Sequence, residues 1–485
     1  MKELLKNILL IYSFVFIPAI AFASEDQCLK CHSELDDEAS KKFLDDVHYK
    51  VGLSCKDCHG GNSSYDDMDM AMSKKNGFIG VPKLNDISAL CAKCHSNKEL
   101  IQKYNPSLST NQFEDLKLSI HGSLSTSGKE MILQCTTCHN HHGIKKVSDP
   151  KSPVYPVNVP NTCSKCHNNA IYMQSYNPSL TVDQLSKYRT SKHGKLNSAG
   201  NDKAAECASC HGSHFILSSK DVRSKTYKLN IPQTCSNCHS NKEYMKKFKI
   251  ATNQYQQYRS SAHGVAVFEN NDLSAPVCND CHGNHGAAPP GIESISKVCG
   301  ICHVINAQLF SESKHKKVFD ANKYPECETC HGKHDIQKVT DNLLGVDENA
   351  VCSKCHNEKE NTKGFYIAKK MKTIIERLKK QNRIAKNKVY LAEQKGMDMD
   401  ETKYKLRDIN QSLLESRTII HSFDESKFKA STDKGILSSK QVIAEANNAI
   451  DEFYFRRYGL LVSTIIISML ALLTFLYIKR IENNK

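Results

Sequence analysis

The sequence predicts a mainly α-helical and irregular fold, continued by a C-terminal helical stalk and one transmembrane helix. Three observations predict it. Residues 28 to 356 carry a recurring cysteine–histidine motif, with Gly, Pro, Ser and Asn scattered between and no long periodic apolar pattern. Residues 357 to 457 contain no cysteine and many Lys, Glu, Gln and Ala. An uncharged apolar run then covers Tyr458 to Ile478.

The N-terminus has the features of a secretory signal peptide. Lys2 and Lys6 precede an apolar run, and Ala21-Phe22-Ala23 is a small-x-small cleavage signal. We expect cleavage after Ala23, so that residues 1–23 are removed and the rest is exported. An uncleaved membrane anchor is the alternative.

All 22 cysteines belong to one motif, C-x-x-C-H, which occurs eleven times. In chain order the pairs are Cys28 and Cys31, Cys55 and Cys58, Cys91 and Cys94, Cys135 and Cys138, Cys163 and Cys166, Cys207 and Cys210, Cys235 and Cys238, Cys278 and Cys281, Cys299 and Cys302, Cys327 and Cys330, and Cys352 and Cys355. The histidines that directly follow them are His32, His59, His95, His139, His167, His211, His239, His282, His303, His331 and His356.

The C-x-x-C-H motif attaches c-type haem. Its two thiols form thioethers to the porphyrin, and its histidine becomes an axial iron ligand. Zinc sites and disulfides are the alternatives for clustered cysteines, but neither requires a histidine after every second cysteine. We therefore expect eleven covalently bound haems c. With roughly thirty residues per motif the chain cannot build an ordinary apolar core, so the haems themselves form the core.

The remaining eleven histidines match the number of second axial ligands that eleven six-coordinate haems need. They are His48, His121, His141, His142, His193, His214, His263, His285, His315, His334 and His421. Four of them follow a motif histidine by three residues, and the porphyrin separates them from the far face of their own haem. We expect these four to ligate a neighbouring haem. They are His142, His214, His285 and His334.

Two places break this pattern. The second motif, CKDCHGGN, lacks the third-position histidine, whereas CTTCHNHH has an additional one, His141. We expect His141 to supply the missing ligand, with the thioethers of Met68, Met70 and Met72 as the alternative. His421 stands alone on a predicted helix, and we expect it to serve the unpaired haem at Cys352, although an ordinary helix histidine is the alternative.

An internal repeat groups the motifs into pairs. Segments that begin at Cys91, Cys163 and Cys235 start 72 residues apart, end in S-x-H-G, and are followed by a second motif of the form C-x-x-C-H-x-x-H. A shorter copy begins at Cys299 and a first copy at Cys28. Residues 24–356 therefore comprise five haem pairs plus one haem at Cys352.

Residues 357–457 are predicted to form a helical stalk or bundle, with a solvated charged linker as the alternative. Ile367, Met371, Ile374 and Leu378 have helical spacing in a first helix, which Gly396 and residues 398–400 end. A second helix is expected over 401–421. A third is expected near residue 438, after a glycine at 435, with direct continuation into the membrane as one option.

The apolar run 458–478 predicts a transmembrane helix, because its 21 residues span about 31 Å as a helix. A buried core helix is the alternative. Basic residues flank both ends, so they decide orientation weakly. The signal peptide predicts that the haem region is periplasmic or otherwise extracytoplasmic, that the chain is held in a bacterial cytoplasmic membrane, and that residues 479–485 are cytoplasmic.

The net charge of +14 raises the question of nucleic-acid or membrane binding. Haem propionates offer a nearer explanation, because they add many carboxylates that Lys and Arg can offset. No nucleic-acid motif accompanies the charge. We expect redox proteins as partners, with a membrane quinol-oxidising complex as one candidate.

The paired motifs, the C-x-x-C-H-G-x-H form and the Y-N-P-S-L…Q…S-x-H-G block at 104–122 and 176–194 resemble bacterial multihaem c-type cytochromes with doubled C-x-x-C-H motifs, a cytochrome c3-like superfamily. The stretch from Cys58 to Pro82 is similar as well. The resemblance covers residues 28 to 356. It implies low-potential haems with two histidine ligands each, arranged in a stacked chain.

Two functions compete. For an electron-transfer protein we expect every haem to be six-coordinate, whereas for an oxidoreductase that resembles hydroxylamine oxidoreductase or nitrite reductase we expect one open catalytic haem. The matched histidine count and the absence of a C-x-x-C-K motif favour electron transfer, so we assign no catalytic residue. A structural metal-binding protein is a third interpretation.

Overall fold

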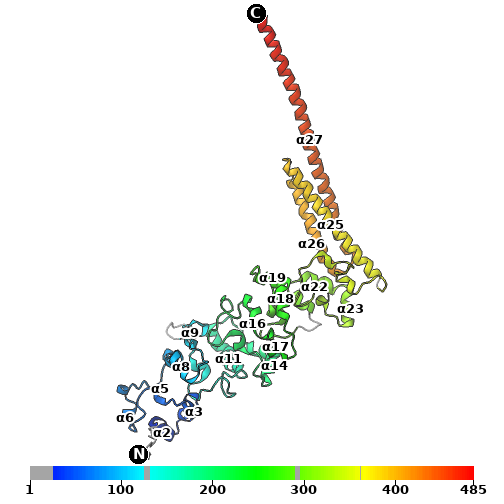
Figure 1. Cartoon of the computed structure of the whole chain (residues 1–485). Coiled ribbons are helices and arrows are strands. Elements are labelled where there is room, and N and C mark those ends of the chain that lie inside the picture. The colour runs from blue at the N-terminus through cyan, green and yellow to red at the C-terminus, as the bar shows by residue number, and fades with distance from the viewer. Residues whose placement is uncertain (1–25, 125–130, 290–294, 361, 485) are drawn as a thin grey trace, which may run out of the picture. The chain divides into compact units, whose positions relative to one another are not determined.

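The structure is a computed structural model, and it describes residues 26–124, 131–289, 295–360 and 362–484. The described residues form helices joined by turns, with a single isolated bridge between Leu124 and Met131 and no strand. By its contacts the chain divides into two units (Figure 1). Unit 1 comprises residues 1–235 and 283–288, and unit 2 comprises residues 236–282 and 289–485.

Unit 1 is built from short helices. Its described elements are α2 (Gln27–Glu34), α3 (Glu38–Leu44), α4 (Val47–Lys50), α5 (Cys55–His59), α6 (Met68–Ala71), η1 (Lys74–Asn76), α7 (Asn85–His95), α8 (Lys98–Tyr104), α9 (Gln112–Leu118), η2 (Ile120–Gly122), α10 (Cys135–His139), α11 (Val159–His167), α12 (Ala170–Tyr176), α13 (Gln184–Thr190), α14 (Lys192–Ser198), α15 (Cys207–His211) and η3 (Lys228–Asn230). The boundary between the units falls within α16 (Ile231–His239).

Unit 2 begins with similar short helices and ends with three long ones. Its described elements are α17 (Lys242–Lys246), α18 (Gln254–Ser260), α19 (Ala262–Phe268), α20 (Cys278–His282), α21 (Ile295–Gly300), α22 (Val304–Ser311), α23 (Lys314–Asn322), α24 (Glu326–His331), η5 (Asp341–Leu343), η6 (Cys352–Lys354), α25 (Thr362–Gln394), α26 (Asp400–Ile419), η7 (Ile420–Ser422) and α27 (Glu425–Asn483).

The three long helices pack side by side as a bundle, which we call the stalk (Figure 1). One end of its core contains Met371, Ile375 and Phe428, and the other contains Val389, Ile409 and Val442. These residues recur at helical spacing, so each helix turns one apolar face inward. The sequence therefore correctly predicted that the stalk is helical.

The third stalk helix begins earlier than the sequence predicts. The expectation of a start near residue 438 was wrong, because α27 begins at Glu425 and Gly435 lies inside it. A Cβ atom at Gly435 would lie only 2.7 Å from Cβ of Ser412 and 3.0 Å from Cδ1 of Leu378. Gly435 is therefore the point where three helices approach closely, and it does not break the helix.

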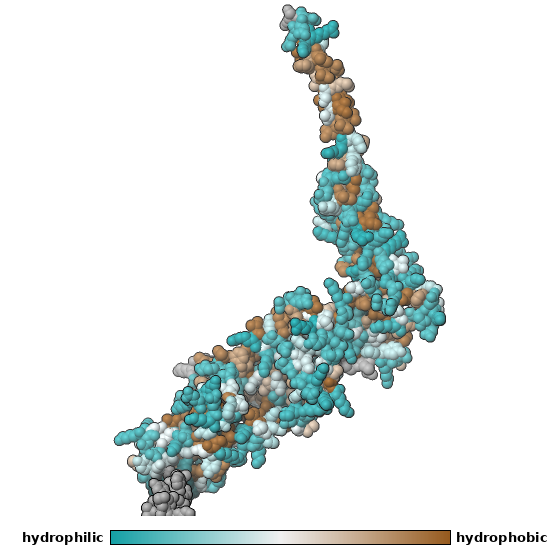
Figure 2. Space-filling view, in the orientation of Figure 1, coloured by the Kyte–Doolittle hydropathy of each residue, from teal (hydrophilic) through white to brown (hydrophobic). Residues whose placement is uncertain are grey.

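The last part of α27 is long and apolar enough to cross a membrane. It continues beyond its two partners, and Figure 2 shows the apolar residues gathered along this projecting part. Its large apolar side chains are exposed, among them Leu460 and Leu470. Soluble proteins rarely expose so continuous an apolar surface, so this segment is compatible with a membrane anchor. The expected signal peptide, residues 1–23, lies outside the described residues.

Candidate functional site

The second motif of each pair forms a helix that ends at its histidine. Helices α5, α10, α15 and α20 each run from the first cysteine to the histidine, and α24 begins one residue earlier. The next residue has a positive φ, as at Gly212 with φ 86° and Asn140 with φ 67°. Glycine adopts this conformation without steric cost, which explains the C-x-x-C-H-G form. This residue ends the helix directly after the motif histidine.

The S-x-H-G block places the other group of histidines. Ser119, Ser191 and Ser261 cap the following helical turn, and each Oγ accepts a hydrogen bond from the glycine amide three residues later, at 2.8 to 3.1 Å. A Cβ atom at the block's glycine would collide with a backbone carbonyl of the preceding helix, as Gly122 would with that of Leu116. Serine and glycine thus fix the first turn, and with it the histidine between them.

The central observation is that nine pairs of histidine rings lie with centroids 5.8 to 6.3 Å apart. These pairs are His48–His95 (5.9 Å), His59–His142 (6.1 Å), His121–His167 (6.0 Å), His139–His214 (6.1 Å), His211–His285 (6.1 Å), His263–His303 (6.3 Å), His282–His334 (5.9 Å), His315–His356 (5.8 Å) and His331–His421 (6.1 Å). Each pair lies within one unit.

This spacing fits an iron ion held between two imidazoles. Metal–nitrogen bonds of about 2.0–2.1 Å on both sides hold two ring centroids about 6 Å apart. Every pair combines one motif histidine with one histidine outside the motifs. The donor set around each pair therefore fits haem c with two axial histidines.

The motif cysteines remain available for thioether bonds. All 22 lie in the described residues, and none of them forms a disulfide there. The second cysteine of each motif is at least partly accessible to solvent. For example, Cys210 and Cys302 are exposed, and Cys166 and Cys238 are half-buried. Cys302 lies just beyond the end of α21, whereas the other three lie within the helix of their motif. Their role as attachment points for haem stays a prediction from the motif.

The pairs of histidines follow two connection rules. A third-position histidine pairs with a motif histidine of an earlier pair, as His214 does with His139. A histidine between the two motifs of a pair joins the first motif of the following pair, as His121 does with His167. Each third-position histidine therefore faces a motif histidine other than its own, as expected from the sequence, and its ligation of haem stays a prediction.

His421 has a different partner from the one predicted. It pairs with His331 of the tenth motif, whereas His356 of the last motif pairs with His315. The assignment of His421 to the haem at Cys352 was therefore wrong. The physical reason is that His315 obeys the second connection rule and already reaches the last motif. His421 lies in η7, and its ring lies 6.1 Å from that of His331, so it faces the tenth motif instead.

Two of the predicted second axial ligands, His193 and His141, are not among these nine pairs. His193 and His239 belong to different units, and their roles stay predictions from the sequence repeat. His141 is exposed, and its ring centroid lies 5.2 Å from that of its neighbour His142. In the described part of the chain no ring contact joins His141 to a motif histidine, so the expectation that it is an axial ligand stays a prediction. Met68, Met70 and Met72 are exposed.

Burial keeps most paired imidazoles in the neutral form that binds metal. It lowers the pKa of His121 to about 4, with His167 and His211 as further causes. Burial is also the largest cause that lowers the pKa of His139 and of its partner His214. A neutral imidazole offers a nitrogen lone pair, whereas the protonated ring does not.

Several paired histidines are also oriented by hydrogen bonds. Nδ1 of His48 lies 2.9 Å from the carboxylate of Asp46, whose side chain is only 2 % exposed. Nδ1 of His59 lies 2.9 Å from the carbonyl oxygen of Gly80, and Nδ1 of His421 lies 3.0 Å from that of Thr418. A partner at Nδ1 fixes the tautomer that presents Nε2 to a metal.

The cysteines show that consecutive motifs are neighbours in space. The thiols of Cys91 and Cys135 hydrogen-bond each other, which raises the pKa of Cys91 and lowers that of Cys135 to about 6. The same kind of hydrogen bond joins two further pairs of thiols, Cys163 with Cys207 and Cys299 with Cys327. In each pair it raises the pKa of the first thiol and lowers that of the second.

A second set of cysteines joins one pair of motifs to the next. Burial raises the pKa of four thiols, and a cysteine of the following motif adds to the rise. These thiols, with their neighbours, are Cys58 with Cys94, Cys138 with Cys163, Cys281 with Cys299, and Cys330 with Cys352. Within each unit the attachment sites therefore follow one another in sequence order.

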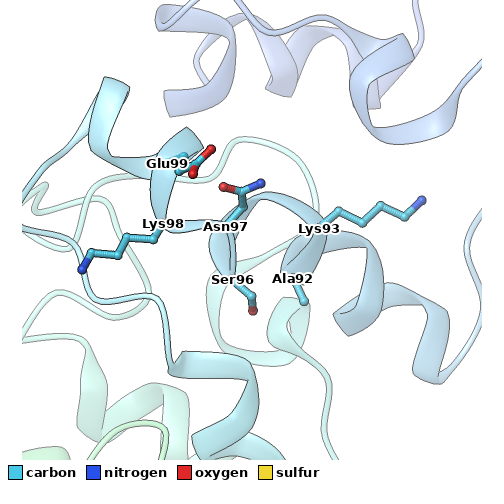
Figure 3. Close-up of a pocket in the computed structure, with 6 residues that line it drawn as sticks. All are labelled: Ala92, Lys93, Ser96, Asn97, Lys98 and Glu99. Carbon is cyan, nitrogen blue, oxygen red and sulfur yellow. The ribbon is translucent and has the colours of Figure 1, made fainter.

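A surface pocket lies where α7 meets α8, and Figure 3 shows the six residues that line it, with Lys93 and Lys98 extending in opposite directions. The lining is mostly polar and contains no cysteine or histidine. The pocket thus contributes no axial ligand and has no part in the paired histidine arrangement.

Three family models match parts of the chain. The model described as cytochrome c3 matches residues 47–168, the model of the doubled CXXCH motif matches residues 315–361, and the model of cytochrome c554 and c-prime matches residues 15–60. No curated protein and no solved structure matches the chain. The matched regions contain motifs and paired histidines from both units, and the matched families bind haem c covalently.

Proposed function

Because this chain is a multihaem c-type cytochrome, a class that transfers electrons, we propose that it is a membrane-anchored electron-transfer protein with eleven covalently bound haems. Haem c supplies the one-electron exchange between ferrous and ferric iron. The chain supplies the attachment sites, the axial ligands and the anchor. The nine histidine pairs are the observation that carries this proposal.

The paired histidines favour electron transfer over catalysis. An iron with an imidazole on each side cannot bind a substrate without losing a ligand. His139 with His214, and His282 with His334, come from segments far apart in the chain, so each pair also fastens two repeats together. Such cross-linking keeps the attachment sites close and rigid, which suits rapid electron exchange.

The order of the cysteines supports a chain of haems. In unit 1 the electrostatic interactions between cysteines run from the first motif to the sixth, beginning with Cys28, which contributes to the raised pKa of Cys55. In unit 2 they run from the eighth motif to the last, ending at Cys330 and Cys352. The repeat continues through the boundary in the sequence, with Cys235 starting 72 residues after Cys163. We therefore infer a stacked series in sequence order within each unit.

The anchor is the apolar end of α27. Residues 425–457 of this helix separate η7 from the apolar segment, and they measure roughly 50 Å at about 1.5 Å per residue. The axial pair His331–His421 is thereby held well away from the bilayer surface. A membrane quinol-oxidising complex would reach this pair only through a part that projects from the bilayer, so we propose a projecting or water-soluble redox protein as its partner.

The proposed sidedness is extracytoplasmic. The proposed sidedness rests on the signal-peptide pattern at residues 1–23. It rests also on haem attachment, which the C-x-x-C-H motif of every repeat predicts. We place the haem units in the periplasm, or otherwise outside the cytoplasmic membrane, and residues 479–485 in the cytoplasm.

Haem counting tests this proposal. The full-length protein, extracted with detergent, should carry eleven haems by pyridine haemochrome assay and by intact mass, with a mature N-terminus at Ser24. The matched control replaces Cys352 and Cys355 with alanine, which should reduce the count to ten. Zinc in stoichiometric amount, or a count far below eleven in fully matured protein, would contradict the proposal.

A further inference from the structure

In the described residues, no imidazole ring lies opposite His32, the histidine of the first motif. The third-position histidine of one pair serves an earlier pair, and the histidine between two motifs serves the next pair. The first motif of each pair therefore depends on the pair before it. The motif at Cys28 and Cys31 is the first in the given sequence, and neither rule assigns to His32 a histidine of the described residues.

The structure agrees with this deduction. All 22 histidines lie in the described residues, because the segments 1–25, 125–130, 290–294, 361 and 485 contain none. Among the described residues, no imidazole ring contacts that of His32, and its side chain is 48 % exposed. By contrast, nine of the other ten motif histidines face a second ring at 5.8 to 6.3 Å.

The first motif is nonetheless built as an attachment site. Cys28, Cys31 and His32 lie on α2, which Asp26 caps through its carboxylate. The carbonyl oxygen of His32 accepts hydrogen bonds from the Asp37 amide and the Ser40 hydroxyl. Nδ1 of His32 lies 3.6 Å from a carboxylate oxygen of Asp37, the side expected of an iron ligand whose Nε2 binds metal.

His141 is the main internal candidate for the opposite face, and hydrogen bonds to Asp46 and Val47 hold the loop that carries it. His142, beside it, faces His59 of the second motif. The amide of Ile144 donates to the Asp46 carboxylate at 2.7 Å, and the amide of Val47 donates to the Ile144 carbonyl at 2.8 Å. These contacts fix the segment that carries His141, and its ring contacts only the ring of His142 in the described residues.

We propose that the haem at Cys28 and Cys31 has His32 as its only protein ligand, and that its opposite iron position binds a small exogenous ligand. This inference rests on the proposed function, because it assumes that a haem is attached there. The ligand class is a molecule that donates through one carbon, nitrogen or oxygen atom. The chain would then combine a series of closed haems with one ligand-binding haem at its N-terminal end.

Carbon monoxide titration of the reduced, detergent-solubilised full-length protein tests the proposal. The expected result is one equivalent of CO bound per chain. His214→Ala is the matched control, since it removes the ring opposite His139 in the same unit and should raise binding to two equivalents. His141→Ala should leave the single equivalent unchanged, and so should the combined Met68→Leu, Met70→Leu and Met72→Leu variant.

Two results would overturn the proposal. The first is no CO binding by the unmutated protein although His214→Ala binds one equivalent. The second is a gain of one equivalent on His141→Ala or on the triple methionine variant, which would identify that residue as the missing ligand. In both cases a count of eleven haems would leave the proposed electron-transfer function intact, whereas a failed haem count would remove that function first.

Discussion

The imidazole rings of His331 and His421 face each other with centroids 6.1 Å apart and planes inclined by only 22°. His331 belongs to the tenth motif, and His421 lies in the turn between the last two stalk helices. A haem ligated by both residues would fasten the stalk to the haem-binding part of unit 2. Arg417 adds a bidentate ion pair with Asp341 at 2.9 Å beside this junction.

Replacing His421 should open the haem of the tenth motif. We expect His421→Ala to convert one low-spin haem to high-spin and to add one equivalent of CO binding, whereas His421→Met should retain a low-spin haem because methionine is also an axial ligand. The double variant with His315→Ala should open two haems, because His315 serves His356. A single opened haem in that double variant would show that both histidines serve the same iron.

Asp46 should lower the reduction potential of the haem held by His48 and His95. Its carboxylate accepts from Nδ1 of His48, and a charged acceptor strengthens this bond by about 1 kcal/mol over a neutral one. Asp46→Asn should therefore raise that potential by on the order of 40 mV, measured by spectroelectrochemical titration. Asp45→Asn is the control, because Asp45 is exposed and pairs with Lys50 and Lys145. Equal shifts in both variants would contradict this role.

The same interaction should depend on pH. Burial alone would raise the pKa of Asp46, but hydrogen bonds from His48 and from the Ile144 amide outweigh it and lower the pKa. A carboxyl with a lowered folded pKa stabilises the fold above its unfolded pKa, and this contribution is lost as pH falls through the folded value. The potential of this haem should therefore rise below about pH 4, and Asp46→Asn should remove that part of the pH dependence.

Gly122→Ala should disturb the haem that His121 and His167 share. A Cβ atom there meets the carbonyl of Leu116, so the turn that carries His121 must shift. We expect part of the protein to gain a high-spin haem and the melting temperature to fall, with an overpacking cost of about 1–3 kcal/mol. Ser123→Ala, one residue later on the same turn, serves as the control. An unchanged spectrum in Gly122→Ala would show that the glycine does not position the histidine.

Truncation after Arg457 should release a water-soluble protein that keeps all its haems. The buried residues of α27 lie between Phe428 and Ala446, so the stalk core survives the cut. Lysine substitutions at Ile466 and Leu470 in the full chain should weaken membrane association without truncation, at about 2.5–3.5 kcal/mol for each central lysine. Membrane fractionation measures both. A truncated form that still pellets with membranes would contradict the anchor.

The sequence predicted the chemistry of the site better than its connectivity. The regular C-x-x-C-H spacing indicates haem attachment directly, and the position of His214 shows that it cannot serve its own haem. The partner of each histidine depends on how neighbouring repeats pack, and His421 lies 65 residues beyond the last motif histidine. The second connection rule assigns His315 to the last motif, which leaves His331 as the partner of His421. This rule became visible only in the structure.

The stalk shows the same division. Apolar spacing predicted its helices, because buried positions such as Met371 and Leu378 recur at helical intervals. Glycine at position 435 suggested a helix end from propensity alone. In the structure this glycine lies inside a helix. A glycine is needed there because a Cβ atom at position 435 would lie too close to Ser412 and Leu378, where the three helices cross.

Low-temperature EPR of the oxidised full-length protein, quantified against its haem content, tests the central claim most directly. Paired histidines from different motifs should make ten of eleven haems low-spin, with a single high-spin haem from the motif at Cys28. A spectrum with several high-spin haems per chain would contradict the pairing of His139 with His214 and its counterparts, and with it the account of this chain as a series of closed electron-transfer haems with one open haem at the motif of Cys28.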